Sequence, residues 1–125
     1  MILELTQEFY FEAAHTLDRE YDAESSRRVH GHTYYAEVTL RGEPDPATFM
    51  ITDLATLRSR IEQVRSELDH HLLDEVEGLG KPTIEALSML IARRLKALEP
   101  RVIAVRVSRK ASGDSCICRL FTSEP

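Results

Sequence analysis

Alternating apolar and polar residues predict four β-strands, two near each end of the chain. The segments that alternate in this way are Ile2–Phe11, Val29–Leu40, Val102–Val107 and Cys116–Phe121, and such alternation is typical of strands with one buried face. A polar stretch without periodicity, Asp18–Arg28, separates the first two strands and predicts a loop. The residues Lys110–Asp114, which include Gly113, predict the turn between the last two strands.

The middle of the chain has the three- and four-residue apolar spacing of amphipathic helices. The first stripe follows the candidate cap Asp53 and comprises Leu54, Leu57, Ile61, Val64 and Leu68. The second follows the candidate cap Thr83, ends before Pro100 and comprises Ile84, Leu87, Ile91, Leu95 and Leu98. The order of elements predicts an α+β fold, with both helices on one face of a four-stranded antiparallel sheet. We expect residues 1–125 to form one domain whose open sheet edges favour oligomerisation.

Composition and charge narrow the range of functions. The formal net charge is −5 and the basic residues are scattered, so nucleic-acid binding is not expected. No run approaches the ~18 apolar residues of a membrane-spanning helix, and the opening MILELTQEF does not resemble a targeting signal. Cys116 and Cys118 are only two residues apart, which disfavours a disulfide between them. We therefore expect a cytoplasmic protein with no membrane or nucleic-acid partner.

The histidines of the chain are clustered in three places: His15, His30-Gly31-His32 and Asp69-His70-His71. Side chains two residues apart on a strand point to the same side, so His30 and His32 can reach one ion. His15, at the end of the preceding strand, would supply a third imidazole and leave one tetrahedral position open, as in catalytic zinc sites. The alternative for His-x-His is an ordinary polar strand face.

Four short motifs follow one another along the chain: Phe11-Glu12-Ala13-Ala14-His15, His30-Gly31-His32-Thr33-Tyr34, Leu68-Asp69-His70-His71 and Pro82-Thr83-x-Glu85. In order and spacing they resemble those of the 6-pyruvoyltetrahydropterin and 6-carboxytetrahydropterin synthase family. The resemblance implies the tunnelling fold, with the helix pair inserted between strands 2 and 3, and a hexamer built from two trimers. It also implies a pterin substrate, with queuosine biosynthesis as one candidate pathway.

The same resemblance assigns roles to the histidines. It implies Zn²⁺ held by His15, His30 and His32, in an active site between subunits. A neighbouring chain would supply Asp69 and His70 as the proton-transfer pair. A carboxylate beside an imidazole suits this role, because it can fix the tautomer and stabilise the charged form of the ring.

Two positions depart from the family pattern. Ser26 stands four residues before His30, where relatives that eliminate triphosphate have a catalytic cysteine. A serine hydroxyl needs a neighbouring base or a metal to act in its place. Relatives with a glutamate there cleave the side chain in an aldolase-like way, but Glu24 is two positions away. Arg109 aligns with a glutamate that anchors the pterin ring, and a cation would not accept N–H groups of the ring.

Further candidates for substrate contact are Thr83, Glu85 and Arg27 with its neighbour Arg28. Glu85 could instead stabilise the first turn of its helix, whereas guanidinium groups could hold a phosphate or carboxylate. Three functions therefore stay open. The first is a zinc-dependent lyase acting on a pterin side chain. The second is a zinc enzyme of the same fold with a non-pterin anionic substrate in a specialised pathway, and the third is a non-catalytic oligomer that only binds.

Overall fold

The fold is a four-stranded antiparallel sheet with its strands in chain order, β1-β2-β3-β4. The computed structural model describes residues 1–17 and 23–120. Its elements are β1 (Leu3–His15), α1 (Ala23–Arg27), β2 (His30–Gly42), α2 (Leu54–Arg65), the 3₁₀ helix η1 (Leu73–Glu75), α3 (Ile84–Leu98), β3 (Val102–Arg109) and β4 (Asp114–Arg119). The predicted α+β fold, with a helix pair between the second and third strands, is confirmed.

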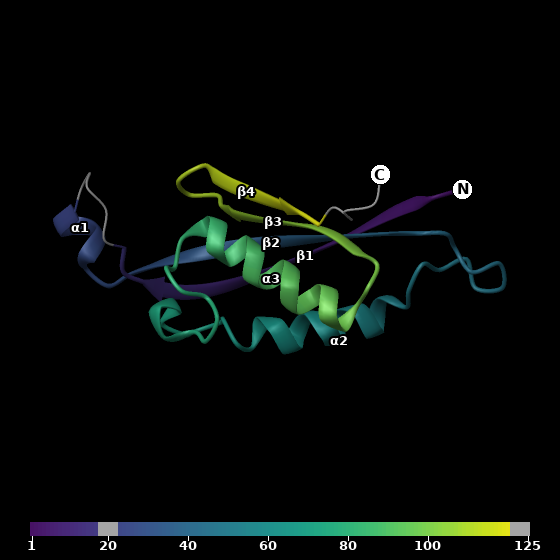
Figure 1. The fold of residues 1–125 in the computed structure, drawn as a ribbon, viewed down its shortest axis with the longest axis horizontal. Helices are drawn as coiled ribbons and strands as arrows, with labels where there is room; N and C mark the ends of the chain where they lie inside the picture. Colours follow the sequence, from purple (N-terminus) through teal and green to yellow (C-terminus); the bar gives the residue numbers. More distant parts are fainter. Residues whose placement is uncertain (18–22, 121–125) are drawn as a thin grey trace.

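Both long helices, α2 and α3, lie against the same side of the sheet (Figure 1). The apolar core between these layers includes Phe11, Tyr34, Val38, Leu57, Leu87 and Leu95. Both predicted caps are confirmed, since Asp53 Oδ1 accepts from the Ala55 N–H at 2.8 Å and Thr83 Oγ1 accepts from the Ala86 N–H at 3.0 Å. No helix within residues 1–17 and 23–120 combines the length and apolar character needed to cross a bilayer.

Two details of the helical regions differ from the prediction. Residues 23–27, expected in a loop, form α1, and an ion pair between Glu24 and Arg28 at 3.3 Å, one turn apart, supports this short helix. Leu54, expected in the buried stripe of α2, is 39% exposed. It lines a surface hollow with Phe49 and Met50 instead of entering the core.

The strands that meet near α1 are longer than their side-chain patterns predict. β1 continues to His15 because its ladder with β2 includes the pair His15 and His30. β3 continues to Arg109, which pairs with Asp114 at the start of β4, so the intervening turn is shorter than expected. Phe121, the predicted end of the last strand, lies outside the described residues.

A second backbone ladder attaches residues 70–72 to the edge of β1. The His70 N–H donates to the Glu12 carbonyl oxygen at 2.6 Å, and the Ala14 N–H donates to the His71 carbonyl oxygen at 3.1 Å. These bonds hold the segment after α2 in a defined register beside the end of β1. The His70 region is therefore placed relative to the strand that ends in His15.

Candidate metal centre and catalytic pair

Three imidazoles meet at the end of the β1–β2 ladder. His15 and His30 are cross-strand partners, and His32 lies two residues further along β2, on the same face. Their ring centroids are between 4.5 and 5.1 Å apart, and one nitrogen of each ring lies within 4.8 Å of the other two. The convergence expected from the sequence is therefore present. We call these three residues the triad.

Backbone carbonyl groups orient two of the rings. His15 Nδ1 lies 2.8 Å from the Pro82 carbonyl oxygen, and His30 Nδ1 lies 2.7 Å from that of Arg28. Because a carbonyl oxygen can only accept, each Nδ1 must be the protonated donor, which leaves a free lone pair on each Nε2. Carbonyl partners of this kind orient histidines that bind metals.

The spacing of the nitrogens suits a zinc ion. The Nε2 atoms of His15 and His32 face each other at 3.1 Å, and two lone pairs at this distance repel unless a proton or a cation lies between them. Nitrogens bound to one tetrahedral Zn²⁺ at about 2.0–2.1 Å would be about 3.3 Å apart. Three neutral imidazoles with an open fourth position are also a usual donor set for catalytic zinc.

Burial favours the uncharged forms of His15 and His32. It lowers the pKa of His15 by more than the hydrogen bond to Pro82 raises it, and the nearby His30 and Arg109 lower this pKa further. Burial, followed by the charge of Arg109, also lowers the pKa of His32 to about 4. Both imidazoles are therefore neutral at pH 7, which is the form that binds a metal.

The triad lines a cavity of about 500 Å³, which we call the triad cavity. Its other walls come from the segment around α1 and from the β3–β4 turn: Leu17, Ser25, Ser26, Arg28, Val29, Arg109, Ser112 and Asp114. Ser26 is buried there, and its carbonyl oxygen accepts from the Leu17 N–H at 2.6 Å. Arg27 is exposed on α1 and does not line the cavity, whereas its neighbour Arg28 does.

The guanidinium of Arg109 is paired with a carboxylate. Its Nη2 donates to Asp114 Oδ2 at 2.7 Å across the β3–β4 ladder, and Ser112 Oγ donates to the same oxygen at 2.8 Å. The Ser112 hydroxyl and then the Arg109 charge hold the pKa of Asp114 below its usual range, so Asp114 is ionised at pH 7. Asp114 was missed as a candidate, although its position just after the turn makes it the cross-strand partner of Arg109.

Asp69 and His70 form a hydrogen-bonded pair. His70 Nδ1 donates to Asp69 Oδ2 at 2.9 Å, and Asp69 Oδ1 accepts from the Glu12 N–H at 2.9 Å. The Glu12 N–H, followed by the bond from His70, keeps the pKa of Asp69 below its usual range. His70 has a φ of 59°, in the left-handed region that residues other than glycine rarely adopt. Its side chain is 77% exposed.

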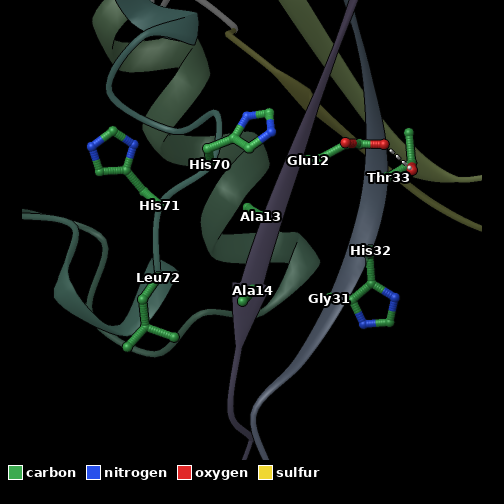
Figure 2. A pocket seen from close by; sticks show the side chains of 9 residues that line it. All are labelled: Glu12, Ala13, Ala14, Gly31, His32, Thr33, His70, His71 and Leu72. Carbon is green, nitrogen blue, oxygen red and sulfur yellow. Dashed lines mark hydrogen bonds between the residues drawn. The ribbon is translucent and has the colours of Figure 1, made fainter.

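A second cleft, of about 530 Å³, lies between this pair and the end of the sheet. Figure 2 shows His70 and His71 on one side of β1 and His32 on the other, all three lining the cleft. Within residues 1–17 and 23–120, no hydrogen bond or ring contact joins His70 to the triad. The structure therefore places the two predicted halves of the site near the same strand end without bringing them into contact.

A family model for 6-pyruvoyl tetrahydropterin synthase matches residues 4–119. The chain belongs to this family. A 6-carboxy-5,6,7,8-tetrahydropterin synthase of Synechocystis sp. is 33% identical over 95 residues, which cover 72% of this chain and 72% of the relative. A dihydroneopterin monophosphate aldolase of Pyrococcus furiosus is 31% identical over 86 residues, covering 69% of this chain and 68% of the relative. The solved 6-pyruvoyl tetrahydropterin synthase of Caenorhabditis elegans matches with a TM-score of 0.84 and 27% identity, over 95% of this chain and 96% of that chain.

In this member of the pterin synthase family, the Pro-Thr-x-Glu motif makes structural contacts through its first two residues. Pro82 accepts the hydrogen bond from His15, and Thr83 caps α3. Glu85 is exposed in the first turn of α3, and neither Thr83 nor Glu85 lines the two cavities described above. A substrate contact by either residue stays a prediction. The contact of Pro82 was missed because a backbone carbonyl has no signature in the pattern of side chains.

Proposed function

We propose that the protein is a zinc-dependent lyase that acts on the side chain of a dihydroneopterin-type substrate. The observation that supports this most directly is the convergence of His15, His30 and His32 on a polar cavity in a chain of the pterin synthase family. One relative is named as an aldolase, so the proposal includes carbon–carbon cleavage as well as carbon–oxygen elimination.

The residues divide the chemistry between them. A bound Zn²⁺ would polarise vicinal oxygens of the substrate and acidify an attached C–H or O–H, and the triad would hold it. His70 would accept and return the proton at Nε2, because its Nδ1–H is engaged by Asp69. The Asp69 carboxylate would stabilise the imidazolium that forms. Ser26, buried in the wall of the triad cavity, would take at most a modest part in proton transfer, since a hydroxyl needs an activating neighbour.

We further propose a homo-oligomer, a hexamer built as a dimer of trimers, in which Asp69 and His70 of one chain serve the triad of its neighbour. One supporting feature is that His70 has no contact with its own triad among the described residues. Another is that β1 and β4 are the edges of the sheet. Unpaired backbone groups on edge strands favour pairing with a second copy.

A non-pterin anionic substrate is the second candidate. Arg28 and Arg109 line the triad cavity, and guanidinium groups bind phosphate and carboxylate well. Each of them already has an acidic partner, Glu24 at 3.3 Å and Asp114 at 2.7 Å. An anionic substrate would have to displace or share these partners, which makes this candidate weaker than the first.

Turnover tests the proposal directly. Zinc-loaded protein of measured metal content would be incubated with dihydroneopterin triphosphate and, separately, with the monophosphate, and the products identified by mass spectrometry. We expect conversion of at least one substrate, loss of activity on chelation and its return with zinc. Ser26→Cys should accelerate an elimination that is limited by proton transfer at this position. If zinc-loaded wild type and Ser26→Cys convert neither substrate, the pterin function is wrong.

A further inference from the structure

We propose that Asp114 recognises the substrate ring, accepting N–H groups from its amino-pyrimidinone edge while Arg109 donates to the neighbouring carbonyl oxygen. This inference rests on the proposed pterin function and deepens it, because it names the side chains that would select the ring. Arg109 lines the triad cavity, but a guanidinium can only donate, so an acceptor for the N–H groups of the ring must come from another residue of the cavity wall. Asp114 is the acidic side chain among the described residues that line the triad cavity.

The carboxylate of Asp114 has one engaged oxygen and one open oxygen. Both of its hydrogen bonds, from Arg109 and from Ser112, end on Oδ2. No group within residues 1–17 and 23–120 donates to Oδ1. An ionised carboxylate oxygen can accept two N–H groups, and the side chain is 46% exposed at the cavity wall. Asp114 is therefore held in place by one oxygen and free to bind a ligand with the other.

Arg109 supplies the complementary donors. Its Nη2 is engaged by Asp114, whereas its Nε is buried without a hydrogen-bond partner. The buried Tyr34 hydroxyl lies close enough to interact with the same guanidinium. The N–H groups of Nη1 and the second N–H of Nη2 are therefore the donors that remain for a ligand. The planar guanidinium presents these donors in a fixed direction beside the acceptor. Together the two side chains offer an acceptor and a donor side by side, with little net charge.

This pairing matches a neutral ring edge better than an anion. A pterin edge carries a ring N–H, an exocyclic amino group and a carbonyl oxygen, which need acceptors for the first two and a donor for the third. A phosphate placed against Asp114 would instead be repelled by its carboxylate. Val29, which also lines the cavity, is 65% exposed and offers apolar surface to a flat ring. The β3–β4 turn is therefore the ring-binding end of the cavity.

The test compares two ring chemistries in wild type and Asp114→Asn. The probes are neopterin and an analogue in which a 2-oxo group replaces the 2-amino group, and their dissociation constants are measured by calorimetry on zinc-loaded protein. We expect Asp114→Asn to weaken neopterin binding roughly tenfold or more. The asparagine amide can donate to the 2-oxo group, so the analogue should gain relative to neopterin. Zinc content should stay unchanged.

Two further variants make the result interpretable. Glu43→Gln removes an exposed acid beyond the opposite end of β2 and should leave both dissociation constants unchanged. Ser112→Ala removes one hydrogen bond to Asp114 but keeps the carboxylate. This variant should still prefer neopterin to the 2-oxo analogue, even if it binds both more weakly than wild type. Wild type that binds neither ring would refute the pterin function itself. Wild type that binds neopterin, with Asp114→Asn binding it equally and with unchanged preference, would refute the role of Asp114 alone.

Discussion

Zinc should bind to a site that is already formed, and it should raise the melting temperature of the protein. The β1–β2 pairing holds His15 opposite His30, and carbonyl groups orient both rings. The apolar core between the sheet and the helices does not include the triad. Removing the ion should therefore lower the free energy of unfolding without unfolding the chain.

The size of the effect follows from binding linkage. An ion at a hundred times its dissociation constant stabilises the folded state by about 2.7 kcal/mol. The unfolding entropy of a 125-residue chain is about 0.26 kcal/mol/K, so this stabilisation corresponds to roughly 10 °C in Tm. His30→Ala removes one of three ligands. If affinity falls a hundredfold, the same zinc concentration stabilises by only about 0.4 kcal/mol, or less than about 2 °C.

Scanning calorimetry of chelator-treated protein, with and without added zinc, measures both shifts. His71→Ala is the matched control, because His71 is an exposed histidine outside the triad, and it should keep the full rise in Tm. A wild type that does not respond to zinc would refute the metal site. So would a His30→Ala variant that responds as strongly as wild type.

Two further predictions concern acidic groups. Asp69→Asn should lower turnover roughly 10²- to 10⁴-fold, because the amide cannot stabilise a charged His70. Zinc content should stay unchanged, since the amide oxygen can still accept from the Glu12 N–H. Full activity in steady-state kinetics would refute a role of Asp69 and His70 in proton transfer. Asp74 accepts two hydrogen bonds from Thr16. Burial raises the pKa of Asp74, but these bonds outweigh that effect and hold the pKa below its usual range. The stability that these bonds contribute is fully present above the pKa that Asp74 has in the unfolded chain. It is lost as the pH falls through the lower pKa that Asp74 has in the folded protein. Urea unfolding should show wild type more stable than Asp74→Asn at pH 7, with a difference that shrinks as the pH falls through the acid range. A difference that stays constant with pH would contradict this account.

Local patterns predicted the structure at most positions where burial or a short-range cap decides it, with Leu54 as an exception. Leu87, Ile91 and Leu95 are buried along α3, as their spacing requires. The triad was also predictable in part, because residues two apart on a strand must share a face, and this applies to His30 and His32. Resemblance and strand order predicted that His15 would lie beside His30 and His32. The pairing of β1 with β2 confirms this prediction.

The missed features depend on which distant segments meet. Pro82 reaches His15 through a backbone carbonyl, 67 positions away along the chain, and no side-chain pattern reports such a contact. Asp114 became visible as a partner of Arg109 only once the turn length set the register of β4. Which of Arg27 and Arg28 lines the triad cavity depends on the short helix α1. The residues of this helix have no apolar periodicity that would predict which side faces the cavity.

The register of one strand pair places both halves of the site. On β1, His15 joins the triad, while three residues earlier the Glu12 backbone binds Asp69. A shift of β1 by one residue would turn its side chains to the opposite face of the sheet. The convergence of His15 with His30 and His32 would then be lost, together with its spacing from Asp69 and His70. Phe11 and Tyr34 oppose such a shift, because they are cross-strand partners, stacked at 5.1 Å and both buried. These two core residues therefore help to fix the register on which the convergence of the triad depends.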